Sequence, residues 1–523
     1  MLHINKLPKH LMLLVSLIVA AMLVLPACAS EEAPTPEEPT EPAVETKYGG
    51  TLRVAESGDT NTLDPAFTLS GADRTFSLNA YDNLVLRMHD LSLKPMLATS
   101  WEPSEDLLTW TFHLREGVKF HHGKVFNADD VVFTIERLID EETGSPAKAA
   151  LESIEKVIKV DDYTVRFELN NANSFFPESL SIYQARMTPS DIDPERFATE
   201  EFGTGPFILV EYIPGERGVF KKNPDYWDEG LPYLDEVILY YLPEPETRVE
   251  ALKSGSVDVY NELAGITVNS AEAAPGVVLS EVASAAYLNM AMRVDTPPFD
   301  NKLLRQAIQA ATDRELIRQT ALLGRGVIGN DTTIPPNDPH YDQSQEIPPY
   351  DVEKAKRLLT EAGYPDGIDL TLHTSSVTEG MDEMAIAFKE SAAPAGIRVS
   401  LKRHPEDVYW SNIWNVEAFT MVGWNGRPPD QALSIVYPCD APWNETRICN
   451  AELDALIIRA RGEVDLTQRK KTYAEVQRIL IDDASRIIAV FKPIFLGLRD
   501  NVRGVSAHPN NWLPLHEAWL ENK

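Results

Sequence analysis

The stretch Leu97–Leu138 constrains the fold more than any other part of the chain. Residues 109–114 alternate polar and apolar side chains, which is the period-two pattern of a half-buried strand. At Asn127 the pattern changes, because this residue can cap a helix N-terminus and apolar residues then recur on one helical face. The apolar residues of that face are Val131, Val132, Ile135 and Leu138. The stretch therefore predicts a strand, a turn and a capped helix.

Short motifs in the same stretch resemble the signature of a known family. They are Ala98-x-Ser100-Trp101, the run TWTFxLRxGVKF from Thr109 to Phe120, and Ala128-x-Asp130-Val131. Together they resemble the extracellular solute-binding proteins that serve ABC importers of peptides, oligosaccharides, opines and nickel. Relatives usually carry HDG-x-P where this chain reads HHGKV at 121–125, and a turn tolerates that exchange.

The resemblance extends over essentially the whole chain after its N-terminal segment. Further matches are the opening strand Tyr48–Ala55, a helix over 77–86, the glycine turn Gly203–Phe207 and a helix and strand over Ala251–Asp258. The helix Asp351–Ala362 has its own cap and stop signals in Asp351 and Gly363. The resemblance implies an α/β fold of the periplasmic-binding-protein type (type II, cluster C), with two lobes and an extra domain inserted in the first lobe.

The expected domain boundaries follow from these matches. Lobe I would comprise 48–84, 205–283 and 491–523, with the inserted subdomain at 85–204, and lobe II would comprise 284–490. Residues 1–27 would form a signal peptide, and 28–47 a lipid-anchor cysteine followed by a disordered acidic linker.

The N-terminus indicates export. Lysines precede the apolar run Leu11–Leu25, which is short for a membrane span and typical of a signal-peptide core. The following Pro26-Ala27-Cys28 resembles a bacterial lipobox, which implies that Cys28 carries lipid; an ordinary cleavage site with an incidental cysteine is the alternative. We therefore expect a protein in the periplasm or on the outer face of the cytoplasmic membrane, anchored to the membrane through Cys28.

Charge and motif content exclude several functions. The net charge of −32 argues against a nucleic-acid partner, which would be repelled. The glycines at 324, 326 and 329 match a dinucleotide motif, but a predicted helix precedes them, so a loop is expected. His121 and His122 point to opposite faces of an extended chain and cannot jointly bind one ion. No catalytic constellation is evident, so we expect a monomeric binding protein that is not an enzyme and has no metal or cofactor.

Two cysteines remain beyond the N-terminal segment. Cys439 and Cys449 form an even pair in a chain that is predicted to be exported, which favours a disulfide. Dipeptide-binding relatives have a similar pair near this place.

The best candidate for ligand contact is the loop that follows a short apolar strand. It contains Trp424, Asn425, Gly426 and Arg427, with Asp430 shortly after, and in relatives the corresponding loop lines the ligand cleft. Dipeptide-binding members carry an acid where this chain has Arg427, and an arginine near Ser375. Recognition of free dipeptides in that mode is therefore not expected. Arg427 is predicted to bind an anionic group stacked on Trp424, the alternative being an ion pair with Asp430 or with an acid across the loop.

Four further residues are weaker candidates for the same site. Tyr409 and Trp410, on a predicted helix, would form another wall of the cleft, with core packing as the alternative, and Ser70 and Gly71 lie in a region that often touches ligand in relatives. We expect the solute-binding component of an ABC importer that captures a small peptide-like or other anionic solute and delivers it to the permease. The alternatives are a ligand-sensing lipoprotein that docks on a signalling partner, or binding of an opine, an oligosaccharide or a metal chelate.

Overall fold

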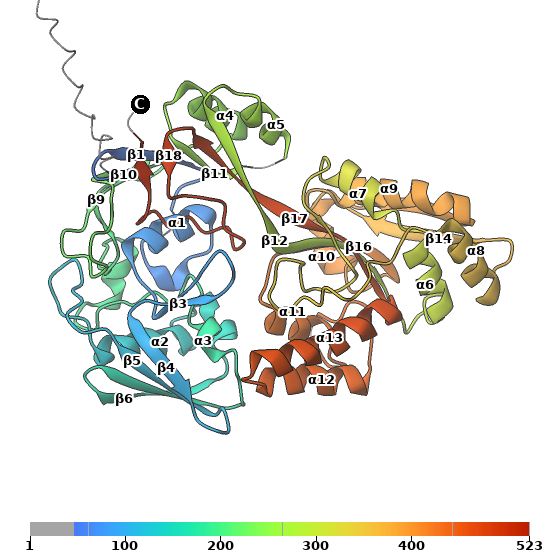
Figure 1. Cartoon of the computed structure of the whole chain (residues 1–523), viewed down its shortest axis with the longest axis horizontal. Helices are drawn as coiled ribbons and strands as arrows, with labels where there is room; N and C mark the ends of the chain where they lie inside the picture. The colour runs from blue at the N-terminus through green and yellow to red at the C-terminus, as the bar shows by residue number, and fades with distance from the viewer. Residues whose placement is uncertain (1–46, 61, 264, 442, 522–523) are drawn as a thin grey trace, which may run out of the picture. The chain divides into compact units, whose positions relative to one another are not determined.

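The computed structural model describes residues 47–521 except 61, 264 and 442 (Figure 1). Its largest element is one mixed sheet in which β13 pairs with β17 and the other strands follow the order β15-β14-β16-β12-β17-β11-β1-β10-β9-β8. The bounds are β1 (Thr51–Glu56), β8 (Phe207–Ile213), β9 (Arg217–Lys222), β10 (Glu236–Tyr241), β11 (Val259–Leu263), β12 (Val277–Met292), β13 (Val327–Ile328), β14 (Ile368–Thr374), β15 (Ile397–Arg403), β16 (Phe419–Trp424) and β17 (Arg486–Arg499).

Two long antiparallel strands join the two ends of this sheet. β12 and β17 pair from Val277 opposite Arg499 to Ala291 opposite Arg486, and the register shifts between Ala283 and Tyr287. Figure 1 shows both strands running from the elements around β11 to those around β16. We call the part around β1 lobe I, the part around β14 lobe II, and the two crossing strands the hinge. The predicted boundaries at 283 and 490 fall within these strands, and the division there stays a prediction.

The helices of lobe I pack on its sheet, and the position of α1 differs from the predicted one. The helix predicted over 77–86 is wrong in position, because α1 spans Gly71–Ala80 and residues 85–87 form β2. The reason is a capping box in which Ser70 and Asp73 satisfy each other's backbone N–H groups. The other helices here are α4 (Pro245–Ser254) and α5 (Ile266–Glu272), while β18 (Val502–Arg503) pairs with β19 (Trp519–Leu520).

The turn at Gly203–Phe207 packs directly against the end of α1. Gly205 donates its N–H to the Ala80 carbonyl at 2.9 Å. A Cβ atom on Gly203 would lie 1.8 Å from the same oxygen, so a larger residue cannot occupy this position without moving the backbone. The predicted turn into a strand is confirmed, since β8 begins at Phe207.

Residues between β2 and this turn build a separate four-stranded sheet. Its order is β4-β5-β7-β6, and α2 packs on it around a core that includes Phe112, Val131 and Phe167. The predicted strand and capped helix are confirmed: Asn127 and Asp130 form a capping box at the start of α2. The bounds are β2 (Val85–Arg87), β3 (Leu93–Pro95), β4 (Ala98–Pro103), β5 (Thr109–Leu114), α2 (Ala128–Ile139), β6 (Ile154–Asp161), β7 (Thr164–Leu169) and α3 (Phe176–Ser179).

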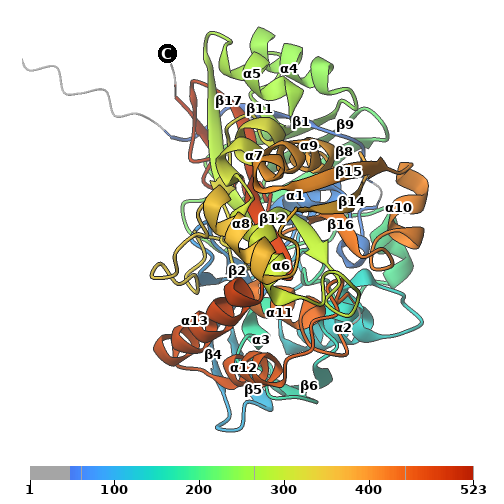
Figure 2. The same cartoon turned by 90° about the vertical axis from the view of Figure 1, so that its right-hand side faces the viewer.

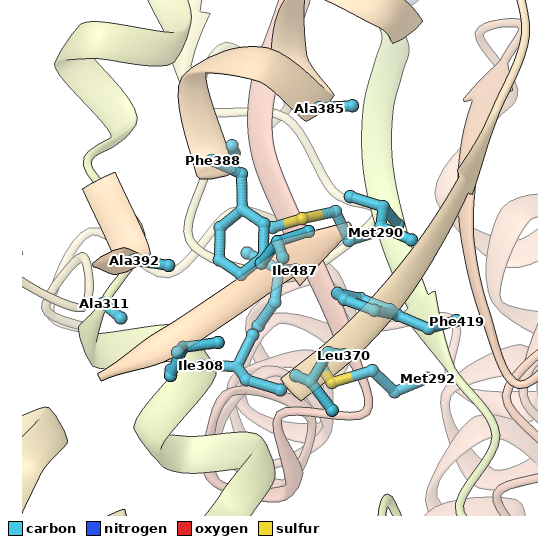
Figure 3. Close-up of a cluster of buried hydrophobic side chains, with 14 of the residues drawn as sticks. Met290, Met292, Ile308, Ala311, Leu370, Ala385, Phe388, Ala392, Phe419 and Ile487 are labelled. Carbon is cyan, nitrogen blue, oxygen red and sulfur yellow. The ribbon is translucent and has the colours of Figure 1, made fainter. Parts of the chain in front are cut away.

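Lobe II contains the core shown in Figure 3. Met290 and Ile487 from the hinge strands meet Phe388 and Phe419, whose rings lie 6.0 Å apart. The Cys439–Cys449 disulfide predicted in this lobe is confirmed. The helices are α6 (Lys302–Ala310), α7 (Arg314–Ala321), α8 (Val352–Glu361), α9 (Met381–Ala392), α10 (Glu406–Asn412), α11 (Pro429–Val436), α12 (Ala451–Gly462) and α13 (Leu466–Asp483).

Besides the hinge, a second connection joins lobe II to the region of the four-stranded sheet. It lies at Phe175, just before α3. Its ring packs in a lobe II core, 4.1 Å from the Arg469 guanidinium and 6.3 Å from the Tyr473 ring. The neighbouring Ser174 donates its N–H to the Arg461 carbonyl at 2.9 Å. Figures 1 and 2 both show α3 close to α12 and α13. We call this group the Phe175 contact.

The predicted signal peptide, Cys28 and most of the linker fall at 1–46, outside the described residues. Within the described part of the chain, none of the helices combines the length and the apolar character needed to cross a bilayer.

Candidate functional site

The loop after β16 carries an aromatic cluster. Trp424 is 9% exposed and stacks on Tyr287 of β12, with ring centroids 6.4 Å apart. The ring of Trp443 lies 5.7 Å from Trp424 on another side. Gly426 allows the loop to lie against β12, because a Cβ atom there would be 3.2 Å from the backbone nitrogen of Ala286. The predicted loop is therefore held against the hinge.

Arg427 lies over these rings and has no acidic partner. Its guanidinium carbon is 5.2 Å from the Trp424 ring centroid and 5.4 Å from that of Trp443, and it donates to the Asn425 carbonyl at 3.2 Å. Among the described residues, none places a carboxylate within ion-pair distance of it. The alternative pairing with Asp430 is wrong, because Asp430 instead accepts from Arg461 at 3.1 Å. Burial without a counter-charge lowers the pKa of Arg427.

A buried ion pair supports the same loop from beneath. Arg486 and Glu445 lie 3.0 Å apart, and both side chains are almost completely buried. Glu445 also accepts hydrogen bonds from Asn289 at 3.0 Å, from Trp414 at 2.6 Å and from Trp424 at 3.4 Å. This carboxylate therefore orders two tryptophans and a hinge residue, and nothing in the local sequence around it indicated that role.

The structure corrects two of the other predicted contacts. Tyr409 is fully buried in the core of lobe II and donates to the Met421 carbonyl at 2.7 Å, so it cannot form a wall of the cleft. Asp430 is half-buried and paired with Arg461, so it is not free to meet a solute. Trp410 is 39% exposed and contacts Trp414 edge-on at 5.7 Å. It reaches the Trp424 cluster only through that ring.

In lobe I the predicted residues Ser70 and Gly71 begin α1 and lie beside Glu262. A Cβ atom on Gly71 would be 2.5 Å from the Glu262 carboxylate. That carboxylate accepts from Arg74 at 2.7 Å and from Asn511 at 2.5 Å. Glu262 itself has a left-handed φ of 56°, which places its side chain at the end of β11 beside the hinge.

The structure shows a cavity of about 230 Å³ beside the hinge, which sequence reasoning missed. We call it the hinge cavity. Its walls are mainly apolar and come from lobe I, lobe II and β17, and include Val268, Leu322 and Phe495. Four charged residues also line it: Glu262, Arg325, Glu379 and Lys492. Residues distant in the chain form this cavity, so no single sequence segment could have indicated it.

A buried acid next to this region makes stability depend on pH. Glu56, at the end of β1, is completely buried, and burial together with the nearby Glu262 charge raises its pKa from 4.5 to about 7. Thr75 and Asn261 hydrogen-bond to it and Arg74 faces it, which partly offsets the rise.

The folded protein therefore holds a proton on Glu56 that the unfolded chain releases. We expect the free energy of unfolding to fall between about pH 4.5 and 7 and then level off, with at most about 3 kcal/mol from this group. Urea unfolding of the wild type and of Glu56→Gln across this range checks it. The difference in the free energy of unfolding between the wild type and Glu56→Gln should vary with pH. A difference that stays constant would contradict the raised pKa of Glu56.

A two-lobed α/β fold with crossing hinge strands, a cavity beside them and an aromatic loop at the end of β16 defines a solute-binding protein. A family model described as "Bacterial extracellular solute-binding proteins, family 5 Middle" matches residues 92–443. The chain belongs to this family, which consists of extracytoplasmic binding proteins for transport.

Individual relatives cover nearly the whole chain. Heme-binding protein A of Haemophilus influenzae is 29% identical over 97% of this chain and 98% of its own length. Di/tripeptide-binding protein 1 of Pseudomonas aeruginosa is 28% identical over 89% of this chain and 94% of its own. The solved structure of HbpA2 from Haemophilus parasuis has a TM-score of 0.83 at 26% identity, covering 90% of this chain and all of that one (100%).

Proposed function

We propose that this chain is the solute-binding component of an ABC importer and captures a small peptide-like solute that carries an anionic group. The solute binds between the lobes, and the closed form is presented to the membrane permease. The observation that carries this proposal is the unpaired guanidinium of Arg427 over two tryptophan rings. The peptide class is supported by relatives named for di- and tripeptides.

Arg427 differs from two other arginines of lobe II in having no acidic partner among the described residues. Arg461 and Arg486 each pair with an acid, Asp430 and Glu445 respectively. Arg427 donates only to the Asn425 carbonyl among the described contacts and lies over two aromatic rings, which leaves guanidinium N–H groups for a carboxylate or phosphate. A half-buried cation without a counter-ion is unfavourable, and an anionic solute group would remove that cost.

We propose that the chain acts as a monomer without catalysis, tethered to the membrane by lipid on Cys28. The signalling role and the opine and oligosaccharide ligands receive no support from the relatives named above, so we do not favour them. One of those relatives is named for heme, an iron chelate, and we favour a peptide because several relatives are named for peptides.

The test is a calorimetric titration with a panel of short peptides in matched pairs that differ only in Glu or Gln, such as Glu-Leu and Gln-Leu. We expect the wild type to prefer the acidic member, because Arg427 adds charge-assisted hydrogen bonds. Arg427→Gln should weaken binding of the acidic member by about 10- to 100-fold and remove the preference. The control is Arg398→Gln, which alters an exposed arginine that pairs with Asp369 on the β15–β14 edge. Unchanged binding by Arg427→Gln would contradict the proposal.

A further inference from the structure

The hinge cavity contains a cation that has no carboxylate partner. Lys492 lies on β17 between Phe491, which packs against Tyr287, and Pro493. It is half-buried, and its ammonium group donates to the backbone carbonyl of Glu379 at 3.4 Å. Within the described ranges, no acidic side chain comes within 4.0 Å of this ammonium group. Burial lowers the pKa of Lys492, although the more distant Glu379 charge opposes that change.

The nearest acid is directed elsewhere. A Cβ atom on Gly265 of lobe I would lie 2.2 Å from Oε1 of Glu379, so this carboxylate reaches across to lobe I. Glu262, the other acid of the cavity, already accepts hydrogen bonds from Arg74 and Asn511. The other cation of the cavity, Arg325, is paired with Glu272 and with Glu281. The cavity thus offers one unpaired ammonium group, one acceptor at its rim and apolar walls.

We infer that the hinge cavity binds the C-terminal residue of a peptide, with the carboxylate on Lys492 and an apolar side chain in the cavity. This inference rests on the proposed function and specifies its substrate class: peptides that end in an apolar residue. Glu379 can accept the N–H of the same residue. A cavity of about 230 Å³ can enclose a side chain such as that of leucine.

The position of the cavity couples this binding to closure. Val268 belongs to α5 of lobe I, Leu322 follows α7 of lobe II, and Phe495 lies on the hinge. A side chain enclosed by all three contacts both lobes at once, and these contacts are complete only when the lobes stay together. Trp424 of the Arg427 loop stacks on Tyr287, whose ring packs against Phe491, the residue before Lys492 on β17.

The test uses three peptides on the whole folded chain: Glu-Leu, its C-terminal amide, and Glu-Gly. For the wild type we expect at least about tenfold weaker binding of the amide and of Glu-Gly than of Glu-Leu. Lys492→Met should bind the acid and the amide equally while keeping the preference for leucine over glycine. Ala321→Phe, which fills the cavity from α7, should weaken Glu-Leu but leave Glu-Gly unchanged. Lys470→Met, an exposed lysine of α13, is the control, and thermal unfolding checks that each variant folds.

The outcomes separate this inference from the proposed function. If Lys492→Met keeps the wild-type ratio between acid and amide, the hinge assignment is wrong. Arg427→Gln could keep the preference for Glu-Leu over Gln-Leu while Lys492→Met loses the preference for the free acid over the amide. In that case Arg427 does not bind the anionic group, and the assignment of the hinge cavity holds. If none of the three peptides binds to the wild type, both assignments are overturned.

Discussion

We expect Glu445→Leu to lower the free energy of unfolding by about 3–5 kcal/mol, because it leaves the buried guanidinium of Arg486 without its counter-charge. The same change removes the acceptor that Asn289, Trp414 and Trp424 share. Urea unfolding followed by circular dichroism measures the stability loss. Because Trp424 loses its hydrogen bond, peptide binding by the variant should also weaken.

A double variant serves as the control for this prediction. Glu445→Leu combined with Arg486→Met removes both buried charges, and apolar replacement of a complete buried pair is often close to neutral. We therefore expect the double variant to be more stable than the single one. A double variant that is less stable than Glu445→Leu would show that the guanidinium contributes chiefly through Tyr287, to which it donates at 3.3 Å, and not through Glu445.

We expect Phe175→Ala to lower the free energy of unfolding by about 3 kcal/mol and to weaken the contact between lobe II and the region of the four-stranded sheet. Phe175 is 4% exposed, and its removal would leave a void between Arg469, Tyr473 and the ring of His340, which lies 5.9 Å away. Since this residue joins two parts of the chain, small-angle X-ray scattering should also show a larger radius of gyration.

The matched control is Phe133→Ala. Phe133 belongs to α2 and contacts Phe197 at 6.3 Å, and both residues lie in the region 85–204. This change should reduce stability without altering the scattering curve. Equal scattering from Phe175→Ala and the wild type would show that the hinge strands alone set the arrangement of the lobes.

Local signals in the sequence predicted local structure well. Asn127 and Asp130 indicated the start of α2, and the glycines at 203 and 205 indicated a turn, because caps and tight turns depend on residues close together in the chain. The helix over 77–86 was misplaced because it was placed by resemblance to the family and not by the capping box at Ser70. Tyr409 was misassigned because a tyrosine can serve a core and a cleft equally well.

The parts of the site that sequence reasoning missed depend on residues far apart in the chain. Glu445, between α11 and α12, forms an ion pair with Arg486 at the start of β17. Lys492 reaches the backbone of Glu379 only because β17 lies beside the start of α9. A single sequence contains no local pattern for such pairs. The loop at Trp424 was predictable because a single short segment supplies both Trp424 and Arg427.

The two ends of the described chain lie together in lobe I. Gly50, just before β1, approaches the side chain of Leu520 on β19, since a Cβ atom there would be 3.3 Å from it, and the Lys47 ammonium lies 5.8 Å from the ring of Trp519. A tether that enters at Lys47 therefore pulls on lobe I alone. A rotation of lobe II about the hinge would leave this attachment point in place, so it would do no mechanical work against the membrane anchor proposed at Cys28.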